Sequence, residues 1–213
     1  MTDLATVRDH IATSAKLARR SPADITLIAV SKTRGVDQIE PLIAAGQRDF
    51  GESRVQEAAT KWPALRAAHP DLRLHMIGQL QSNKAAEAVA LFDVIHSLDR
   101  RSLLASLSDA STKANRFPAC FVQVNVGEEE QKGGIVPTDL GAFLAAVRAS
   151  PLPLAGLMCI PPAELEPAPF FAFLSELARR HDVAGLSMGM SADYEIAVKL
   201  GATHVRVGSA LFA

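Results

Sequence analysis

The sequence predicts an α/β fold in which eight parallel strands close into a single (β/α)8 barrel of the TIM type. Eight short apolar runs recur along the 213 residues, and each run except the last is followed by a stretch with helical spacing. Runs without polar alternation are typical of parallel strands that are buried on both faces. Closing eight such units into a barrel leaves no sheet edge, whereas a doubly wound open sheet is the main alternative.

Residues 1–20 are expected to form a leading helix. Leu4, Val7 and Ile11 lie on one stripe at three- and four-residue spacing, which is the pattern of an amphipathic helix. The first strand lies within Ile25–Thr33, ITLIAVSKT, a run of aliphatic and β-branched residues. The helix expected at 36–45 ends at Gly46, a residue that suits a left-handed C-terminal cap.

The remaining strands and helices alternate at the unit length expected of parallel crossovers. Strands are expected at 48–51, 73–77, 93–97, 119–126, 154–160, 185–188 and 203–207. Helices are expected at 54–68, 84–90, 101–114, 138–149, 169–180 and 193–200. No Pro/Gly/Ser-rich linker divides the chain, so residues 1–213 are expected to form one domain.

The composition excludes several classes of protein. A net charge of −1 argues against a nucleic-acid binder that depends on bulk electrostatics. Cys120 and Cys159 both lie in apolar runs, which fits free thiols in a reducing compartment and predicts no metal site. The N-terminal stretch contains acidic residues and has no continuous apolar core, so neither a signal peptide nor a membrane span is expected. We therefore expect a cytoplasmic protein.

Lys32 stands at the carboxyl end of the first predicted strand. Ligand sites of parallel sheets and barrels lie at that end of the strands. A partly desolvated lysine there favours the neutral amine, which can attack an aldehyde to form a Schiff base. The alternative is that Lys32 simply caps the strand and extends into water, as most lysines do.

Two loops rich in Gly and Ser follow the seventh and eighth strands. The first reads MGMSADYE and contains Ser191, and the second reads RVGSALF and contains Gly208-Ser209. Barrels frequently bind phosphate with these two loops, through backbone N–H groups. Each loop alone is weak evidence because Gly and Ser are ordinary turn residues, but together they occupy the two expected positions.

Several polar residues interrupt the apolar strands. Alternation along the last strand turns Arg206 toward the barrel centre, where its guanidinium could donate to a ring nitrogen of a ligand. A salt bridge to an acidic residue inside the barrel explains Arg206 equally well. His75, Gln123 and Asn125 are explained at least as well by satisfied hydrogen bonds in the core as by ligand contacts.

A family resemblance rests on several motifs in a fixed order. The motifs AVSKT, RDFGES, LHMIGQLQSNK, VQVNVGEEEQKGG and LSMGMSADYEIAVKLGATHVRVGSALF resemble the YggS/PROSC family of pyridoxal 5′-phosphate (PLP) homeostasis proteins, over residues 25–212. The resemblance implies a barrel like the N-terminal domain of bacterial alanine racemases, without their second β-domain. It also implies that PLP is held as an aldimine on Lys32.

The same resemblance assigns the other cofactor contacts. It implies that Ser191 and the Gly208-Ser209 loop hold the phosphate, and that Arg206 approaches the pyridine nitrogen. An arginine there would keep that nitrogen unprotonated and weaken the cofactor as an electron sink. Ser53 departs from the pattern, since the family usually has Asn after GE, and the chain stops at LFA where the family continues. The predicted cofactor-binding residues are Lys32, Ser53, Asn125, Met190, Ser191, Arg206, Gly208 and Ser209.

Three functional hypotheses remain open. The first is a monomeric PLP carrier in vitamin B6 homeostasis that buffers the cofactor or delivers it to apo PLP-dependent enzymes, without robust turnover. The second is a PLP-dependent racemase, which would need a second base opposite Lys32. The only tyrosine, Tyr194, lies at a helix start and has no second domain to carry it. The third is a scaffold whose PLP site is vestigial.

Overall fold

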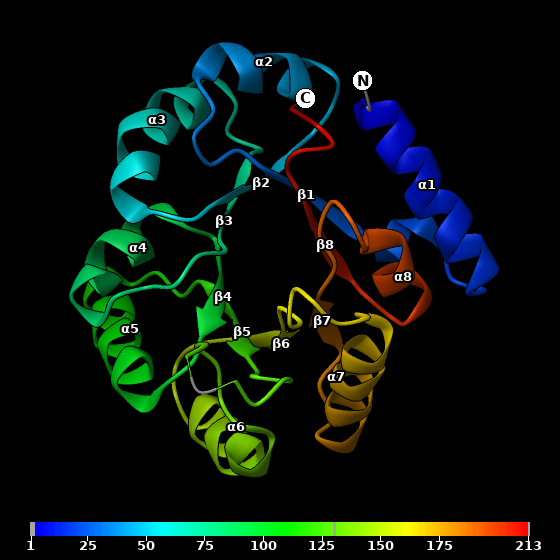
Figure 1. The fold of residues 1–213 in the computed structure, drawn as a ribbon. Coiled ribbons are helices and arrows are strands. Elements are labelled where there is room, and N and C mark those ends of the chain that lie inside the picture. Colours follow the sequence, from blue (N-terminus) through cyan, green and yellow to red (C-terminus); the bar gives the residue numbers. More distant parts are fainter. Residues whose placement is uncertain (1–2, 130, 213) are drawn as a thin grey trace.

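Eight parallel strands form the centre of the molecule (Figure 1). The computed structural model describes residues 3–129 and 131–212. The strands are β1 (Thr26–Val30), β2 (Asp49–Glu52), β3 (Arg73–Met76), β4 (Val94–Leu98), β5 (Ala119–Gln123), β6 (Leu154–Met158), β7 (Gly185–Ser187) and β8 (His204–Val207). Each strand pairs in parallel with its neighbours in sequence, and β1 also pairs with β8. The predicted barrel is therefore confirmed, and an open sheet is excluded.

A ring of helices surrounds the strands (Figure 1). The helices are α1 (Leu4–Leu17), α2 (Val36–Ala44), α3 (Val55–Ala68), α4 (Ala85–Leu91), α5 (Arg101–Ala114), α6 (Leu140–Arg148), α7 (Ala168–Arg180) and α8 (Tyr194–Lys199). Short 3-10 turns occur at Pro22–Asp24, Ser82–Lys84 and Pro137–Asp139. Among the described residues, no helix is long and apolar enough to cross a membrane.

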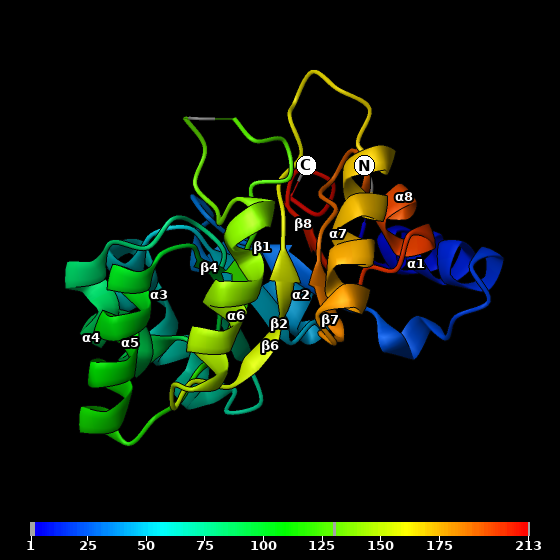
Figure 2. The ribbon, with the colours of Figure 1, turned by 90° about the horizontal axis from the view of Figure 1, so that it is seen from below.

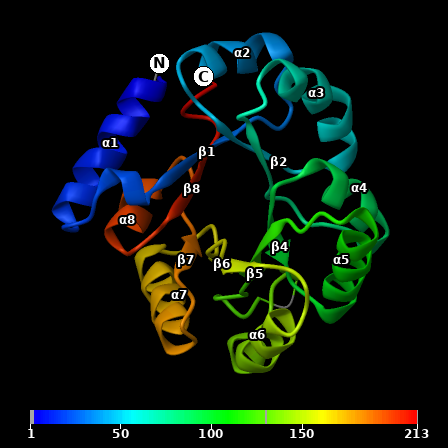
Figure 3. The same cartoon turned by 180° about the vertical axis from the view of Figure 1, so that it is seen from behind.

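The leading helix α1 packs on the outside of the ring. Figure 3 shows α1 beside α8 and next to the β1 and β8 strands. Leu4, Val7 and Ile11 are buried, as the predicted stripe requires. Polar contacts join α1 to α8: the His10 ring lies 3.0 Å from the Tyr194 hydroxyl, and the Arg20 guanidinium, just past α1, donates to the Val198 carbonyl.

Alternation along each strand separates two layers of side chains. One set of strand residues, including Leu27, Leu74 and Val205, joins the large apolar cluster that packs the barrel against its helices. The alternate set faces the barrel interior, and there the apolar cluster is small and consists of Val94, Phe121 and Met158 with two partly buried alanines. Much of the remaining interior is polar, so its hydrogen bonds must be satisfied within the barrel.

Two strands end two or more residues earlier than predicted. β5 stops at Gln123 instead of residue 126, and β6 stops at Met158 instead of residue 160. After β5 the backbone N–H of Asn125 donates to the Ile135 carbonyl, so the chain pairs with its own loop instead of continuing the ladder. Figure 2 shows the loops after β5 and β6 rising beyond the carboxyl ends of the strands. These loops border the end of the barrel at which ligands are expected.

Candidate functional site

A cavity of about 570 Å³ opens at the carboxyl ends of the strands, a size that suits a small-molecule ligand. Its walls include apolar side chains from four different strand ends and loops. They also include seven of the eight residues predicted from the sequence. The lining residues are Val30, Lys32, Ser53, Ile77, Gly78, Ile160, Met190, Ser191, Ala192, Arg206, Gly208 and Ser209.

Lys32 lies two residues beyond the end of β1, in the loop that leads to α2. Its side chain is exposed at the cavity. The expected partial desolvation of Lys32 is therefore wrong. The reason is that β1 ends at Val30, so the amine lies on the rim of the barrel and not inside it. An accessible amine at this position can still reach a ligand in the cavity.

A buried ion pair fixes the backbone on either side of Lys32. Lys61 Nζ lies 2.7 Å from Glu52 Oε1, and both side chains are almost fully buried. Ser31 Oγ and Trp62 Nε1 also donate to Glu52 Oε1, at 2.8 Å and 2.9 Å. Lys61 Nζ donates in addition to the Ser31 and Arg34 carbonyls. The loop that carries Lys32 is thus held to α3 by charge-assisted hydrogen bonds, which are shorter and stronger than neutral ones.

The loops after β7 and β8 are joined by a hydrogen bond. The backbone N–H of Gly208 donates to Ser191 Oγ at 3.1 Å. The loop after β7 turns at Gly189, whose φ of +91° favours glycine, and the Asp193 carboxylate accepts from the Met190 N–H. A Cβ atom at Gly208 would lie 3.3 Å from the Val30 Cβ, so the loop packs tightly over β1. The two predicted phosphate loops therefore form one wall of the cavity.

Arg206 is buried at 4% exposure and faces the barrel interior, as the alternation predicted. Its guanidinium donates to Ser187 Oγ at 2.6 Å and to the Cys159 carbonyl at 3.0 Å. Burial lowers the pKa of Arg206, but arginine stays protonated in proteins. In the part of the chain that the structure describes, no carboxylate lies within salt-bridge distance of Arg206, so the alternative of a direct salt bridge is wrong.

Asn125 is the one predicted site residue that does not line this cavity. It lines a neighbouring cavity of about 320 Å³, together with Gln79, Gln123 and Lys132. The Asn125 side chain is engaged by the backbone of Glu129, donating to its carbonyl and accepting from its N–H. β5 ends before Asn125, so this residue lies in the loop that follows the strand. Asn125 therefore does not line the cavity that contains Lys32, and its contact with the cofactor stays a prediction.

Two other polar residues have their hydrogen bonds satisfied within the core. The His75 ring contacts His96 at 3.0 Å and Asp49 at 2.9 Å. Gln123 Nε2 donates to the Gly133 carbonyl at 2.9 Å. Both observations agree with the alternative of satisfied core groups. Sequence reasoning missed the partners, because His96 and Asp49 come from different strands, and it missed the cavity walls Ile77, Ile160 and Ala192.

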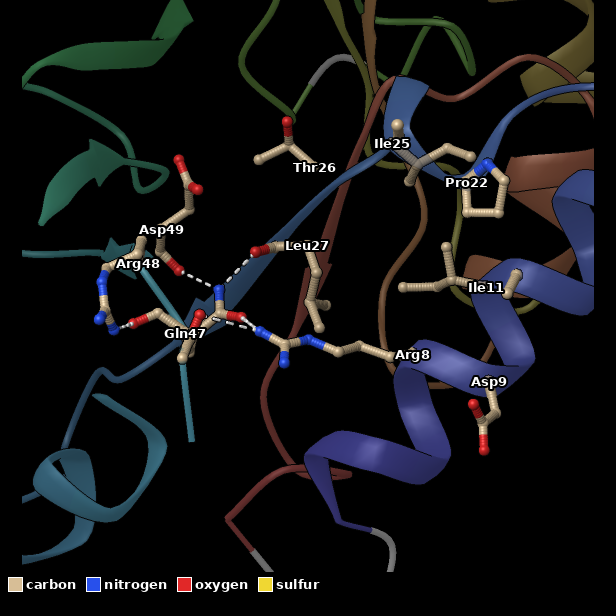
Figure 4. Close-up of a pocket in the computed structure, with 13 residues that line it drawn as sticks. Arg8, Asp9, Ile11, Pro22, Ile25, Thr26, Leu27, Gln47, Arg48 and Asp49 are labelled. Atoms are coloured by element: carbon tan, nitrogen blue, oxygen red, sulfur yellow. Dashed lines mark hydrogen bonds between the residues drawn. The ribbon is translucent and has the colours of Figure 1, made fainter. Parts of the chain in front are cut away.

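A second cavity of about 570 Å³ lies at the opposite end of the barrel, around the starts of β1 and β2 (Figure 4). Arg8 reaches from α1 and donates to the Ala45 and Gly46 carbonyls and to the Gln47 side chain. Arg48 donates to the Asp71 carboxylate and to the Ile43 carbonyl. Both guanidinium groups are therefore engaged within the chain. The cavity with Lys32, at the ligand end of the barrel, is the better candidate.

Comparisons with known proteins agree on one family. The profile described as "Alanine racemase, N-terminal domain" matches residues 2–213. A protein named pyridoxal phosphate homeostasis protein from Escherichia coli (strain K12) is 39% identical over 99% of this chain and 94% of its own length. Its namesake from Pseudomonas aeruginosa is 41% identical over 99% and 93%. The structure of PipY from Synechococcus elongatus PCC7942 with PLP bound has a TM-score of 0.82 and 40% identity, covering 95% of this chain and all of PipY. The chain therefore belongs to the pyridoxal phosphate homeostasis protein family, within the fold family of the alanine racemase N-terminal domain.

Proposed function

We propose that this protein binds pyridoxal 5′-phosphate through Lys32 and serves in cellular PLP homeostasis by buffering the cofactor or delivering it. The observation that carries the proposal is the single cavity that unites an accessible lysine, two Gly/Ser loops and a buried arginine. The relatives named for PLP homeostasis and the PLP-bound structure of PipY support the same cofactor.

The residues of the cavity fit this cofactor. Ser191 and the backbone N–H groups of Gly208 and Ser209 would hold the phosphate, since they lie on one wall of the cavity. The Gly208 N–H, which donates to Ser191 Oγ in this structure, would turn from that hydroxyl to the phosphate. Apolar side chains such as Ile77 and Ile160 would pack against the ring. When bound, PLP supplies an aldehyde carbon that amines attack and a ring that can accept electrons.

Arg206 would face the pyridine nitrogen. Its guanidinium cannot accept a proton and keeps a positive charge, which disfavours protonation of the ring nitrogen. Met190 and Ser53 complete the lining beside the ring and the lysine. A ring held in this way is a weaker electron sink, so the arrangement favours holding the cofactor over catalysis on it.

A carrier fits the cavity better than a racemase does. A racemase needs a second base on the opposite face of the substrate carbon. Among the described residues that line the cavity, Lys32 is the only side chain suited to act as a base. Tyr194 is buried, and its hydroxyl contacts His10 of α1 on the outside of the barrel.

The proposal extends to the setting of the protein. We infer a single PLP-binding domain over residues 1–213 that works as a monomer, because large exposed apolar side chains such as Leu17, Phe117 and Leu165 lie scattered along the chain. Apo PLP-dependent enzymes would be its partners. A cytoplasmic location is supported by Cys120 and Cys159, which are free and buried.

The test compares cofactor transfer with turnover. The PLP-loaded protein is mixed with an apo PLP-dependent enzyme, and separately with L- or D-alanine in deuterated water while the α-proton is followed by NMR. The carrier proposal predicts that the enzyme gains activity and that α-proton exchange is negligible. Rapid exchange with loss of stereochemistry would overturn it in favour of a racemase.

A further inference from the structure

Five side chains form a continuous hydrogen-bonded chain through the barrel interior. Arg206 donates to Ser187 Oγ at 2.6 Å, and that hydroxyl lies 2.9 Å from His96 Nδ1. His96 Nε2 lies 3.0 Å from His75 Nδ1, and His75 Nε2 lies 2.9 Å from the Asp49 carboxylate. The chain crosses β8, β7, β4, β3 and β2, and no two successive members come from the same strand.

The chain joins the two ends of the barrel. Arg206 lines the candidate cofactor cavity at the carboxyl ends of the strands. Asp49 lines the cavity at the amino ends, and its carboxylate points away from Gln47 (Figure 4). The Asp49 side chain is 20% exposed, whereas His75 is fully buried. Water therefore reaches Asp49, the carboxylate end of this hydrogen-bonded chain, at the end of the barrel opposite to the cofactor site.

The donor and acceptor properties of these groups favour one direction of donation along the hydrogen-bonded chain. A guanidinium can only donate and a carboxylate can only accept. Ser187 Oγ accepts from Arg206, and among the described residues its only other partner is His96, so directing its hydrogen to His96 Nδ1 is the arrangement that leaves no buried donor unpaired. Burial, together with the nearby charge of the Arg206 guanidinium, holds the pKa of His96 well below 6.5, so this ring is neutral and carries its hydrogen on Nε2.

The position of the hydrogen on the His75 ring follows from that on His96. His75 Nδ1 must accept from His96 Nε2, which leaves the hydrogen of His75 on Nε2, facing Asp49. Every donor thus points from Arg206 toward Asp49, with a positive charge at one end and a negative charge at the other. Hydrogen bonds aligned in this way polarise and strengthen one another in a low-dielectric interior.

Neighbouring charges leave this polarity intact. The His204 ring lies 5.9 Å from the His96 ring, and burial lowers its pKa to about 4, so it is neutral at neutral pH. Arg73 Nε lies 3.8 Å from Asp49 Oδ1, but its side chain is 56% exposed and the contact is a weak one. Asp49 remains the carboxylate to which the buried charge of Arg206 is connected.

We propose that Asp49, His75, His96 and Ser187 are positioning residues for Arg206: together they hold its guanidinium at the pyridine nitrogen and supply its counter-charge from the far end of the barrel. The role at the pyridine nitrogen rests on the proposed PLP site. The hydrogen-bonded chain itself is present in the protein without cofactor. It links the electronic state of the cofactor ring to a carboxylate at the opposite face.

The first test uses the protein without PLP and reads the histidine tautomers by 15N NMR. The expected result is a neutral Nε2–H tautomer for both His75 and His96 at pH 7, with assignments from His75→Gln and His96→Gln. An imidazolium or an Nδ1–H tautomer at His96 would reverse the direction of the chain and overturn the proposal.

The second test is a double-mutant cycle on PLP affinity and on the absorbance maximum of the bound cofactor. Ser187→Ala removes one hydrogen bond to a charged group and should weaken PLP binding about tenfold. Asp49→Asn removes the counter-charge and should shift the absorbance maximum in the same direction as Ser187→Ala. The double variant should bind PLP about as well as Ser187→Ala alone, because the chain is already cut.

Ser97→Ala is the matched control. Ser97 lies next to His96 on β4, and its buried hydroxyl has no hydrogen-bond partner among the described residues. Ser97→Ala should leave the absorbance maximum unchanged. In the double variant with Asp49→Asn, the fold-change in PLP affinity should equal the product of the two single fold-changes. The positioning role is overturned if the fold-changes in PLP affinity of Ser187→Ala and Asp49→Asn also multiply in the double variant. It is likewise overturned if neither substitution moves the absorbance maximum. An unmodified protein that fails to bind PLP would instead overturn the proposed function.

Discussion

Ser191 Oγ accepts a hydrogen bond from the Gly208 backbone N–H at 3.1 Å, so the loop after β7 is tied directly to the loop after β8. The two residues are far apart in the sequence, yet they form one wall of the candidate cofactor cavity. This N–H and hydroxyl are oriented toward each other. An anion placed there could accept directly from the Ser191 O–H, whereas the Gly208 N–H would reach it only by giving up its hydrogen bond to Ser191 Oγ.

Ser191→Ala is expected to weaken PLP binding. The substitution removes one charge-assisted hydrogen bond to the phosphate, which corresponds to about 1.5 to 3 kcal/mol. Isothermal titration calorimetry with PLP, and with inorganic phosphate as a competitor, measures the change. Ser106→Ala removes a hydroxyl that donates to the Ser102 carbonyl within α5; this variant is the control and should bind PLP normally. Equal affinity of Ser191→Ala and the control would exclude Ser191 from the phosphate site.

Gly208→Val should weaken PLP binding more than Ser191→Ala does. A Cβ atom at this position would lie 3.3 Å from the Val30 Cβ, and the two further methyl groups would have to enter the cavity or displace β1. Gly208→Ala adds only the Cβ and provides an intermediate step. PLP association constants that fall from the unmodified protein to Gly208→Ala and further to Gly208→Val support a close approach of the backbone to the ligand. Three similar constants would contradict it.

Lys61→Met should destabilise the fold strongly. The variant leaves the Glu52 carboxylate buried without its cation, a change that costs about 3 to 5 kcal/mol in comparable ion pairs. Urea denaturation measures the free energy of unfolding. The double variant Lys61→Met/Glu52→Gln removes both charges and should recover most of the loss. If Lys61→Met unfolds at the same urea concentration as the unmodified protein, the ion pair does not stabilise the loop that carries Lys32.

The stability of the protein should fall as the pH is lowered from about 6.5 toward 4. Burial lowers the pKa of His204 to about 4, whereas in the unfolded chain it has the ordinary value near 6.5. Between these values the unfolded chain binds more protons, so each pH unit removes up to about 1.4 kcal/mol of stability. The contribution is fully present above pH 6.5. Urea denaturation at a series of pH values should show a shallower pH dependence for His204→Gln, and identical slopes would contradict this account.

The barrel could be predicted from the sequence because each strand is a local apolar run with its own turn signals. Lys32, Ser191, Arg206 and Gly208 could be placed for the same reason, since each follows or ends a strand whose carboxyl end faces the ligand side. The position of Asn125 could not be predicted. It depends on where β5 stops, which is decided by a backbone pairing within the loop.

The interior contacts were beyond the reach of sequence reasoning. His96 and Ser187 are separated by 91 positions, and only the closed barrel brings their side chains together. The Lys61–Glu52 pair likewise depends on how α3 packs on β2. Local patterns predict which residues face inward, but they do not say which inward residues touch across the barrel.

Locating PLP on the protein tests the assignment of Lys32 most directly. The protein is incubated with PLP, treated with borohydride and digested, and the modified peptide is identified by mass spectrometry alongside a visible absorbance spectrum. Lys84→Ala, which removes a lysine that pairs with Glu87 outside the cavity, is the control. We expect one reducible adduct at Lys32, retained in Lys84→Ala and lost in a folded Lys32→Ala variant. Undiminished visible absorbance and an adduct at another lysine in Lys32→Ala would contradict it.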